Sequence, residues 1–116
     1  MRSTRDVLHN HIASFGRRDL DGILADYAPG AILFTPEGQR VGVDAIRPVF
    51  TGLLAEFAKP GASFELRHES VNGEYAYIWW TAETADNRYE LVTDTFFVRG
   101  GKIEVQSFAA RIQAKS

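Results

Sequence analysis

The sequence predicts an α+β fold in which three helices from the N-terminal half pack on the concave face of a cone-shaped, curved antiparallel sheet. Apolar residues recur at helical spacing up to about residue 57, and from Ser63 onward they recur at every second position. Three pairs of turn-forming residues divide the second half: Asn72-Gly73, Asp86-Asn87 and Gly100-Gly101. Helices first and long antiparallel strands last are typical of α+β proteins.

Each helix is predicted from one apolar face and its end signals. The first face has i, i+3, i+4, i+7 spacing and ends at Gly16; its members are Leu8, His11, Ile12 and Phe15. Asp19 can cap a second helix, which we expect to reach Tyr27 and to stop at Pro29-Gly30. Asp44 can cap a third helix that ends at Lys59-Pro60-Gly61; its apolar face contains Ile46, Val49, Phe50, Leu53 and Phe57.

The strands are predicted from alternation and turn chemistry. Residues 31–35 and 39–42 should form a short hairpin around Pro36-Glu37-Gly38. Four long strands are expected at 63–71, 75–84, 89–99 and 102–112, and their tight turns make them a meander.

Composition narrows the class of protein. The 116 residues are enough for one domain, and 45% hydrophobic with 24% charged residues is close to the average of soluble globular proteins. A net charge of -2 without a basic run argues against nucleic acid as a partner. No run approaches the roughly 20 apolar residues of a membrane span, so we expect a cytoplasmic protein. We expect its single domain to extend over residues 1–116.

Asp94 is the most unusual residue, because it lies within a run of β-branched and aromatic residues where aspartate is normally depleted. A two-residue turn at Asp86-Asn87 would place Trp79 opposite Asp94, and a longer turn would place Trp80 or Ile78 there. Every one of these neighbours is large and apolar, so burial should raise the pKa of Asp94. On the other side, a Gly100-Gly101 turn predicts Ser107 opposite Asp94.

The opposite face of these strands is also apolar. It is expected to carry Ile78, Trp80, Leu91, Phe97 and Phe108, interrupted by Thr93, Thr95 and Gln106. Because one layer of helices can cover only one face, we predict that the other face packs against a second copy of the chain.

His11 occupies a core-facing position of the first predicted helix. A histidine on an apolar face is by itself more often a hydrogen-bonded core residue than a catalytic one. The chain has no cysteine, and no carboxylate lies at ligand spacing from a histidine, so no metal site is predicted.

Several segments together resemble the nuclear-transport-factor-2-like superfamily, and within it the SnoaL-like and ketosteroid-isomerase-like domains. They are Asp19-Leu20-Asp21-Gly22-Ile23-Leu24 with Tyr27-Ala28, Pro36-Glu37-Gly38 with Gly42-Val43-Asp44-Ala45-Ile46-Arg47, and Gly100-Gly101-Lys102-Ile103. The resemblance covers nearly the whole chain. It implies a cystatin-like cone with a mostly apolar pocket and dimers that form through the sheets, but little about activity.

The resemblance also implies roles for particular residues. Asp94 corresponds to an aspartic acid that stays protonated in ketosteroid isomerases and donates to a developing enolate. His11 corresponds to the tyrosine that shares this oxyanion role. The isomerases' general base is an aspartate before a proline, and here that position is Thr35-Pro36, so steroid isomerisation by that mechanism is not expected. SnoaL-like cyclases work with an acidic residue and no cofactor, which would suit Asp94 assisted by His11.

We therefore predict a cofactor-independent acid/base protein, cyclase-like or isomerase-like, with an apolar carbonyl compound as ligand. Asp94 and His11 are the catalytic candidates. The pocket candidates are Phe15, Tyr27, Thr35, Phe50, Leu53, Tyr77, Trp79, Phe96 and Ser107. Two alternatives stay open: a non-catalytic ligand-binding module, and a structural dimer whose aromatic side chains fill the pocket.

Overall fold

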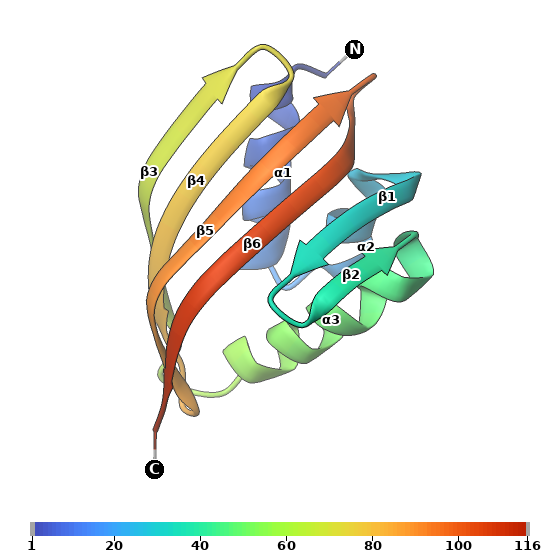
Figure 1. Cartoon of the computed structure of the whole chain (residues 1–116). Helices are drawn as coiled ribbons and strands as arrows, with labels where there is room; N and C mark the ends of the chain where they lie inside the picture. Colours follow the sequence, from blue (N-terminus) through green and yellow to red (C-terminus); the bar gives the residue numbers. More distant parts are fainter. Residues whose placement is uncertain (1, 116) are drawn as a thin grey trace.

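The structure, a computed structural model, describes residues 2–115 and contains three helices and six strands (Figure 1). The helices are α1 (Thr4–Gly16), α2 (Leu20–Ala25) and α3 (Val43–Phe57). The strands are β1 (Tyr27–Thr35), β2 (Gly38–Val41), β3 (Ser63–Asn72), β4 (Tyr75–Glu83), β5 (Asn87–Arg99) and β6 (Lys102–Ala114). They form one curved sheet in the order β2-β1-β6-β5-β4-β3, and the helices lie on one side of it (Figure 1).

The predicted α+β class is confirmed, and one pair of strands departs from the antiparallel pattern. β1 runs parallel to β6, with Ile32 beside Val105 and Phe34 beside Ser107. Tight turns determine direction only for strands that follow one another in the chain. β1 and β6 are separated by β2, α3 and the whole meander, so no local signal in the sequence marks their relative direction.

Side-chain caps start the first two helices. Ser3 accepts a hydrogen bond from the Asp6 backbone N–H, and the Asp6 carboxylate accepts one from the Ser3 N–H, which forms a capping box. Asp19 caps α2 through the Gly22 N–H, as the sequence predicts. The expectation that this helix reaches Tyr27 was wrong, because Tyr27 opens β1. An apolar residue there fits both a helix face and an inward strand position, so spacing alone did not separate the two.

A β-bulge on β6 sets the register between β5 and β6. Val98 pairs with Ile103, but the next pair along is Phe97 with Val105, so Glu104 is an extra residue on β6. A bulge of this kind shifts every later residue of the strand by one position and increases the local bend.

The shift changes the neighbour of Asp94 on β6, and an extra residue in β5 between Tyr89 and Val92 changes its neighbour on β4. Phe108 is its partner on β6, so the predicted Asp94–Ser107 pair was wrong. On β4 its partner is Ile78, which was the alternative register, and not Trp79. Because side chains alternate between faces, Ser107 and Trp79 point away from the face that carries Asp94.

The main core lies between the helices and the concave face of the sheet. Its fully buried members include Val7, Leu8, Ile23, Leu33, Ile46 and Ile103. Within residues 2–115, no helix is both long enough and apolar enough to cross a membrane.

The Glu56 side chain connects the C-terminal end of α3 to the β4–β5 turn by hydrogen bonds. Its carboxylate accepts hydrogen bonds from Thr84 Oγ1 at 2.6 Å, Asn87 Nδ2 at 2.9 Å and Tyr89 OH at 2.8 Å. Burial alone would raise the pKa of Glu56, but these three donors outweigh it and hold the pKa below its ordinary value of 4.5. The contribution of Glu56 to stability is therefore present above pH 4.5 and is lost as the pH falls through its lower folded-state pKa.

We expect Glu56→Gln to lower the free energy of unfolding by about 1–3 kcal/mol at neutral pH, because the amide places a donor against groups that donate. The difference from the wild type should shrink below pH 4.5, where the carboxylate itself becomes protonated. Urea unfolding at several pH values measures both effects. Glu90→Gln is the matched control, since Glu90 is exposed. An equal loss in the two variants would contradict this role of Glu56.

Candidate functional site

A cavity of about 720 Å³ lies between α1, α3 and the concave face of the sheet. This volume is within the range of about 300–1,000 Å³ that is usual for small-molecule sites. Most lining side chains are apolar or aromatic, among them Phe15, Phe50, Leu53, Phe57, Phe96 and Phe108. Three buried polar residues also line it, namely His11, Asp94 and Gln106. The cavity is therefore apolar with one cluster of hydrogen-bonding groups.

Asp94 faces this cavity from β5 and is 7% exposed. Its Oδ2 accepts a hydrogen bond from Trp80 Nε1 at 2.9 Å, and its Oδ1 accepts one from Gln106 Nε2 at 2.9 Å. Burial raises the pKa of Asp94 above its ordinary value of 3.8, although both donors and the nearby His11 oppose the shift. The predicted direction of the pKa shift is confirmed. A carboxyl of this kind can exchange a proton with a ligand at a pH where an exposed aspartate no longer can.

A chain of polar side chains connects Asp94 to His11. The Tyr27 hydroxyl donates a hydrogen bond to Gln106 Oε1, and its oxygen is 3.4 Å from His11 Nε2. Tyr27 is 3% exposed, and burial, followed by the nearby carboxylates of Asp94 and Asp26, raises its pKa well above the ordinary value. Tyr27 therefore acts here as a neutral hydroxyl.

The structure brings most of the sequence-predicted site residues to the cavity. Asp94 and His11 both line it, and Tyr27 lies behind them with its hydroxyl between His11 and Gln106. The pocket candidates on its lining are Phe15, Phe50, Leu53 and Phe96. His11 contacts Phe50 and Phe96 edge-on, with ring centroids 5.6 and 5.8 Å apart.

The other pocket candidates do not line the cavity. Tyr77 pairs with Thr95, Trp79 pairs with Thr93, and Ser107 pairs with Thr95 on the opposite side, so all three lie on the convex face of the sheet. Their placement was wrong because the prediction assumed an unbroken register. The bulge on β6 and a second bulge on β5, where Ala82 pairs with Tyr89 but Trp80 pairs with Val92, each shift one strand by a residue, and a shift of one residue moves a side chain to the other face.

Thr35 lies at the end of β1, and its hydroxyl forms hydrogen bonds within the β1–β2 turn. Thr35 Oγ1 donates to the Gly38 carbonyl at 2.8 Å and accepts from the Glu37 N–H at 3.1 Å. Its neighbours Pro36 and Glu37 line the cavity, whereas Thr35 does not.

Trp80 and Gln106 are site residues that sequence reasoning did not assign. Both were expected on the face away from Asp94, yet both donate to its carboxylate. A glutamine in a strand that is otherwise apolar was the available signal, because such a residue is buried only where its amide finds partners.

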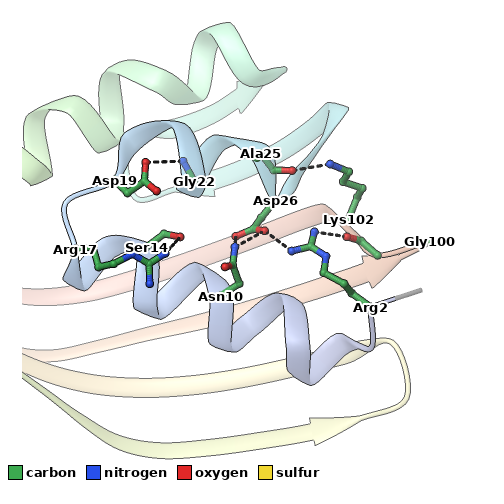
Figure 2. A pocket seen from close by; sticks show the side chains of 11 residues that line it. Arg2, Asn10, Ser14, Arg17, Asp19, Gly22, Ala25, Asp26, Gly100 and Lys102 are labelled. Carbon is green, nitrogen blue, oxygen red and sulfur yellow. Dashed lines mark hydrogen bonds and ion pairs between the residues drawn. The ribbon is translucent and has the colours of Figure 1, made fainter.

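A second, polar cavity of about 500 Å³ lies on the other side of α1. Figure 2 shows Asp26 in it, between the side chains of Asn10 and Arg2. Asp26 accepts from Arg2 Nη1 at 2.7 Å and from Asn10 Nδ2 at 2.9 and 3.1 Å, and its side chain is 1% exposed. Among residues 2–115, no cluster of three or more His, Asp or Glu side chains is arranged to hold a metal ion.

The chain is similar to known proteins along nearly all of its length. Residues 8–106 match the family described as the SnoaL-like domain. No curated protein matches the sequence.

Solved structures resemble the fold closely at low sequence identity. An NTF2-like protein of unknown function from Cytophaga hutchinsonii is 10% identical with a TM-score of 0.79, over 96% of this chain and 92% of that one. A candidate ketosteroid isomerase from Kribbella flavida is 14% identical with a TM-score of 0.77, over 97% and 80%. A candidate polyketide cyclase from Sinorhizobium meliloti is 18% identical with a TM-score of 0.73, over 90% and 94%. At these identities the likeness concerns the fold.

Proposed function

The chain belongs to the family of SnoaL-like domains, and we propose that its cavity binds a small, largely apolar carbonyl compound and acts on it by acid/base chemistry without a cofactor. The observation that carries the proposal is the buried carboxyl of Asp94 with a raised pKa in a cavity lined mainly by apolar side chains. Desolvation strengthens a hydrogen bond or proton transfer to a bound oxygen there.

In this proposal Asp94 gives a proton to the ligand or takes one from it. His11 polarises an oxygen of the ligand through the same polar cluster, and the aromatic side chains of Phe15, Phe50 and Phe96 hold its apolar body. Enolisation and aldol-type steps need only such proton transfers, so these residues supply what the chemistry requires.

A non-catalytic binding module is the second candidate. Both oxygens of Asp94 already accept hydrogen bonds, from Trp80 and Gln106, so the carboxyl could serve only to complete a buried polar network. Thr35 also occupies the position where the resemblance implies a general base. In that case the ligand binds with no turnover.

The binding half of the proposal is tested by filling the cavity. Ala110 lines it from β6, so Ala110→Trp should place an indole where the ligand would lie. We expect binding of the fluorescent naphthyl ketone Prodan to weaken about 5- to 150-fold, because overpacking costs about 1–3 kcal/mol and each 1.4 kcal/mol is tenfold in affinity. A fluorescence titration measures it.

Ala109→Trp is the matched control. Ala109 is exposed and pairs with Thr93 on the convex face, so the same ring there should leave Prodan binding unchanged. Equal affinities in the two variants would show that the ketone binds elsewhere, and no binding to the wild type would favour the purely structural reading. The acid/base half depends on the loss of turnover when Asp94 is replaced by asparagine.

A homodimer formed through the convex face of the sheet and a cytoplasmic location complete the proposal. The dimer is supported by exposed aromatic residues on β4, where Tyr75 is 59% and Tyr77 is 37% exposed.

A further inference from the structure

His11 lies between the two cavities, and one of its ring nitrogens has no hydrogen-bond partner. Nδ1 is buried and unpaired, and the carboxylate oxygen Asp26 Oδ2 lies 3.6 Å from it. Nε2 faces the Tyr27 hydroxyl at 3.4 Å. A buried unpaired polar nitrogen is costly, and a carboxylate oxygen just beyond hydrogen-bond distance is a partner that a small side-chain movement would supply.

Asp26 is built to be an acceptor. Burial would raise its pKa, but His11, Arg2 and Asn10 outweigh burial and hold the pKa below its ordinary value. Arg2 donates only to Oδ1, and Asn10 donates to both oxygens, so Oδ2 keeps room for one more donor. In Figure 2 the Arg2 and Asn10 side chains reach Asp26 within the polar cavity.

On the other side of His11, the Tyr27 hydroxyl can serve either protonation state of Nε2. The Gln106 amide nitrogen donates to Asp94, so its oxygen must accept, and the Tyr27 hydroxyl donates to that oxygen. The lone pairs of the Tyr27 oxygen then face Nε2, which can donate to them when it is protonated. When Nε2 is unprotonated, the hydroxyl hydrogen can turn to Nε2, and Gln106 Oε1 then loses its hydrogen bond from Tyr27.

We propose that Asp26 is a positioning residue for His11: its Oδ2 keeps Nδ1 protonated and fixes the ring, so that Nε2 is the nitrogen that gains and loses a proton toward Tyr27 and the ligand cavity. A catalytic use of this arrangement rests on the proposed function. The arrangement itself is a property of the ligand-free protein. With this arrangement, Asp26 joins the chain of polar side chains that connects His11 to Asp94.

Nitrogen-15 NMR of the ligand-free protein tests the proposal, because long-range proton–nitrogen correlations distinguish the two neutral tautomers of each histidine. The chain has three histidines, and the His11 signals are those that disappear in His11→Gln. We expect His11 to carry its proton on Nδ1. A bare Nδ1 with the proton on Nε2 would overturn the proposal, and this measurement needs neither a ligand nor a variant at Asp26.

Asp26→Asn gives the second readout. Since Arg2 and Asn10 both donate at Oδ1, the amide oxygen should take that side and the NH₂ group should face Nδ1, which would move the His11 proton to Nε2. Asp19→Asn is the control, because Asp19 lines the same polar cavity but contacts Gly22 instead. Its His11 spectrum should equal that of the wild type.

The two proposals fail in different ways. If ketone exchange exists, Asp26→Asn should lower its rate about tenfold or more while Prodan binding stays within about twofold, as expected for a histidine held in the wrong tautomer. An unchanged exchange rate despite a switched tautomer would reduce Asp26 to a structural ion pair and overturn the positioning role. Absence of any exchange in the wild type would contradict the acid/base function and leave the tautomer result standing.

Discussion

Replacement of Asp94 by asparagine is expected to lower proton exchange at the α-carbon of a bound ketone by about 10²–10⁴-fold, the usual contribution of a positioned acid or base. Asparagine keeps the shape of the side chain but cannot give up or take a proton. Gain of deuterium at the α-carbon can be monitored by NMR in heavy water, and it can be measured on simple ketones whatever the natural substrate is. Prodan titration of the same variant separates binding from chemistry.

Asp21→Asn is the matched control for this variant, because Asp21 is exposed on α2. Its exchange rate should equal that of the wild type. If Asp94→Asn exchanges the ketone as fast as the wild type, Asp94 is not the acid or base. If it changes Prodan affinity and the wild type shows no exchange, the binding-module reading is correct.

The same variant carries a pH signature in stability. The pKa of Asp94 is raised in the folded protein, so the wild type loses stability as the pH rises from its ordinary value of 3.8 through the folded-state value. Asparagine cannot ionise and escapes this loss. The melting temperature of Asp94→Asn relative to the wild type should therefore increase with pH over that window, and a constant difference would contradict burial of an ionisable Asp94.

Local patterns predicted the helices and the meander well because each depends on residues close in the chain. The capped α2 start at Asp19 and the turn at Gly100-Gly101 follow from single side chains and from glycines with positive φ of 62° and 75°. Local composition also marks Asp94 as unusual, because aspartate is depleted in runs of β-branched and aromatic residues.

The composition of the site could not be predicted in the same way, because it depends on an extra residue in β6. Ile103, Glu104, Val105 and Gln106 alternate perfectly, which predicts Val105 inside with Ile103. The bulge instead turns Gln106 inward, where it is 4% exposed. An inward glutamine is stable only because Tyr27 and Asp94 satisfy its amide, and these partners come from two other strands. No local pattern contains that information.

The corrected register also decides which residues can form the proposed dimer. The convex face now carries Tyr77 and Trp79 with Phe97 and Thr95, whereas Ile78, Trp80 and Phe108 face the helices. One exposed aromatic in this group, Tyr77, lies on β4, the second strand from the β3 edge of the sheet. In a two-fold dimer each convex face meets the same face of its copy, so any substitution there is introduced twice.

Tyr77→Arg is therefore expected to convert the dimer to a monomer. A charge left buried and unpaired costs about 3–5 kcal/mol, which corresponds to a dimer dissociation constant raised at least about 100-fold. Sedimentation velocity at micromolar concentration measures the change in mass. Val41→Arg makes the same kind of change at a 58% exposed residue of β2, at the other end of the strand order, and should leave the dimer intact. A wild-type chain that sediments as a monomer would refute the dimer. Dissociation by Val41→Arg alone would show that the interface includes β2 instead of β4.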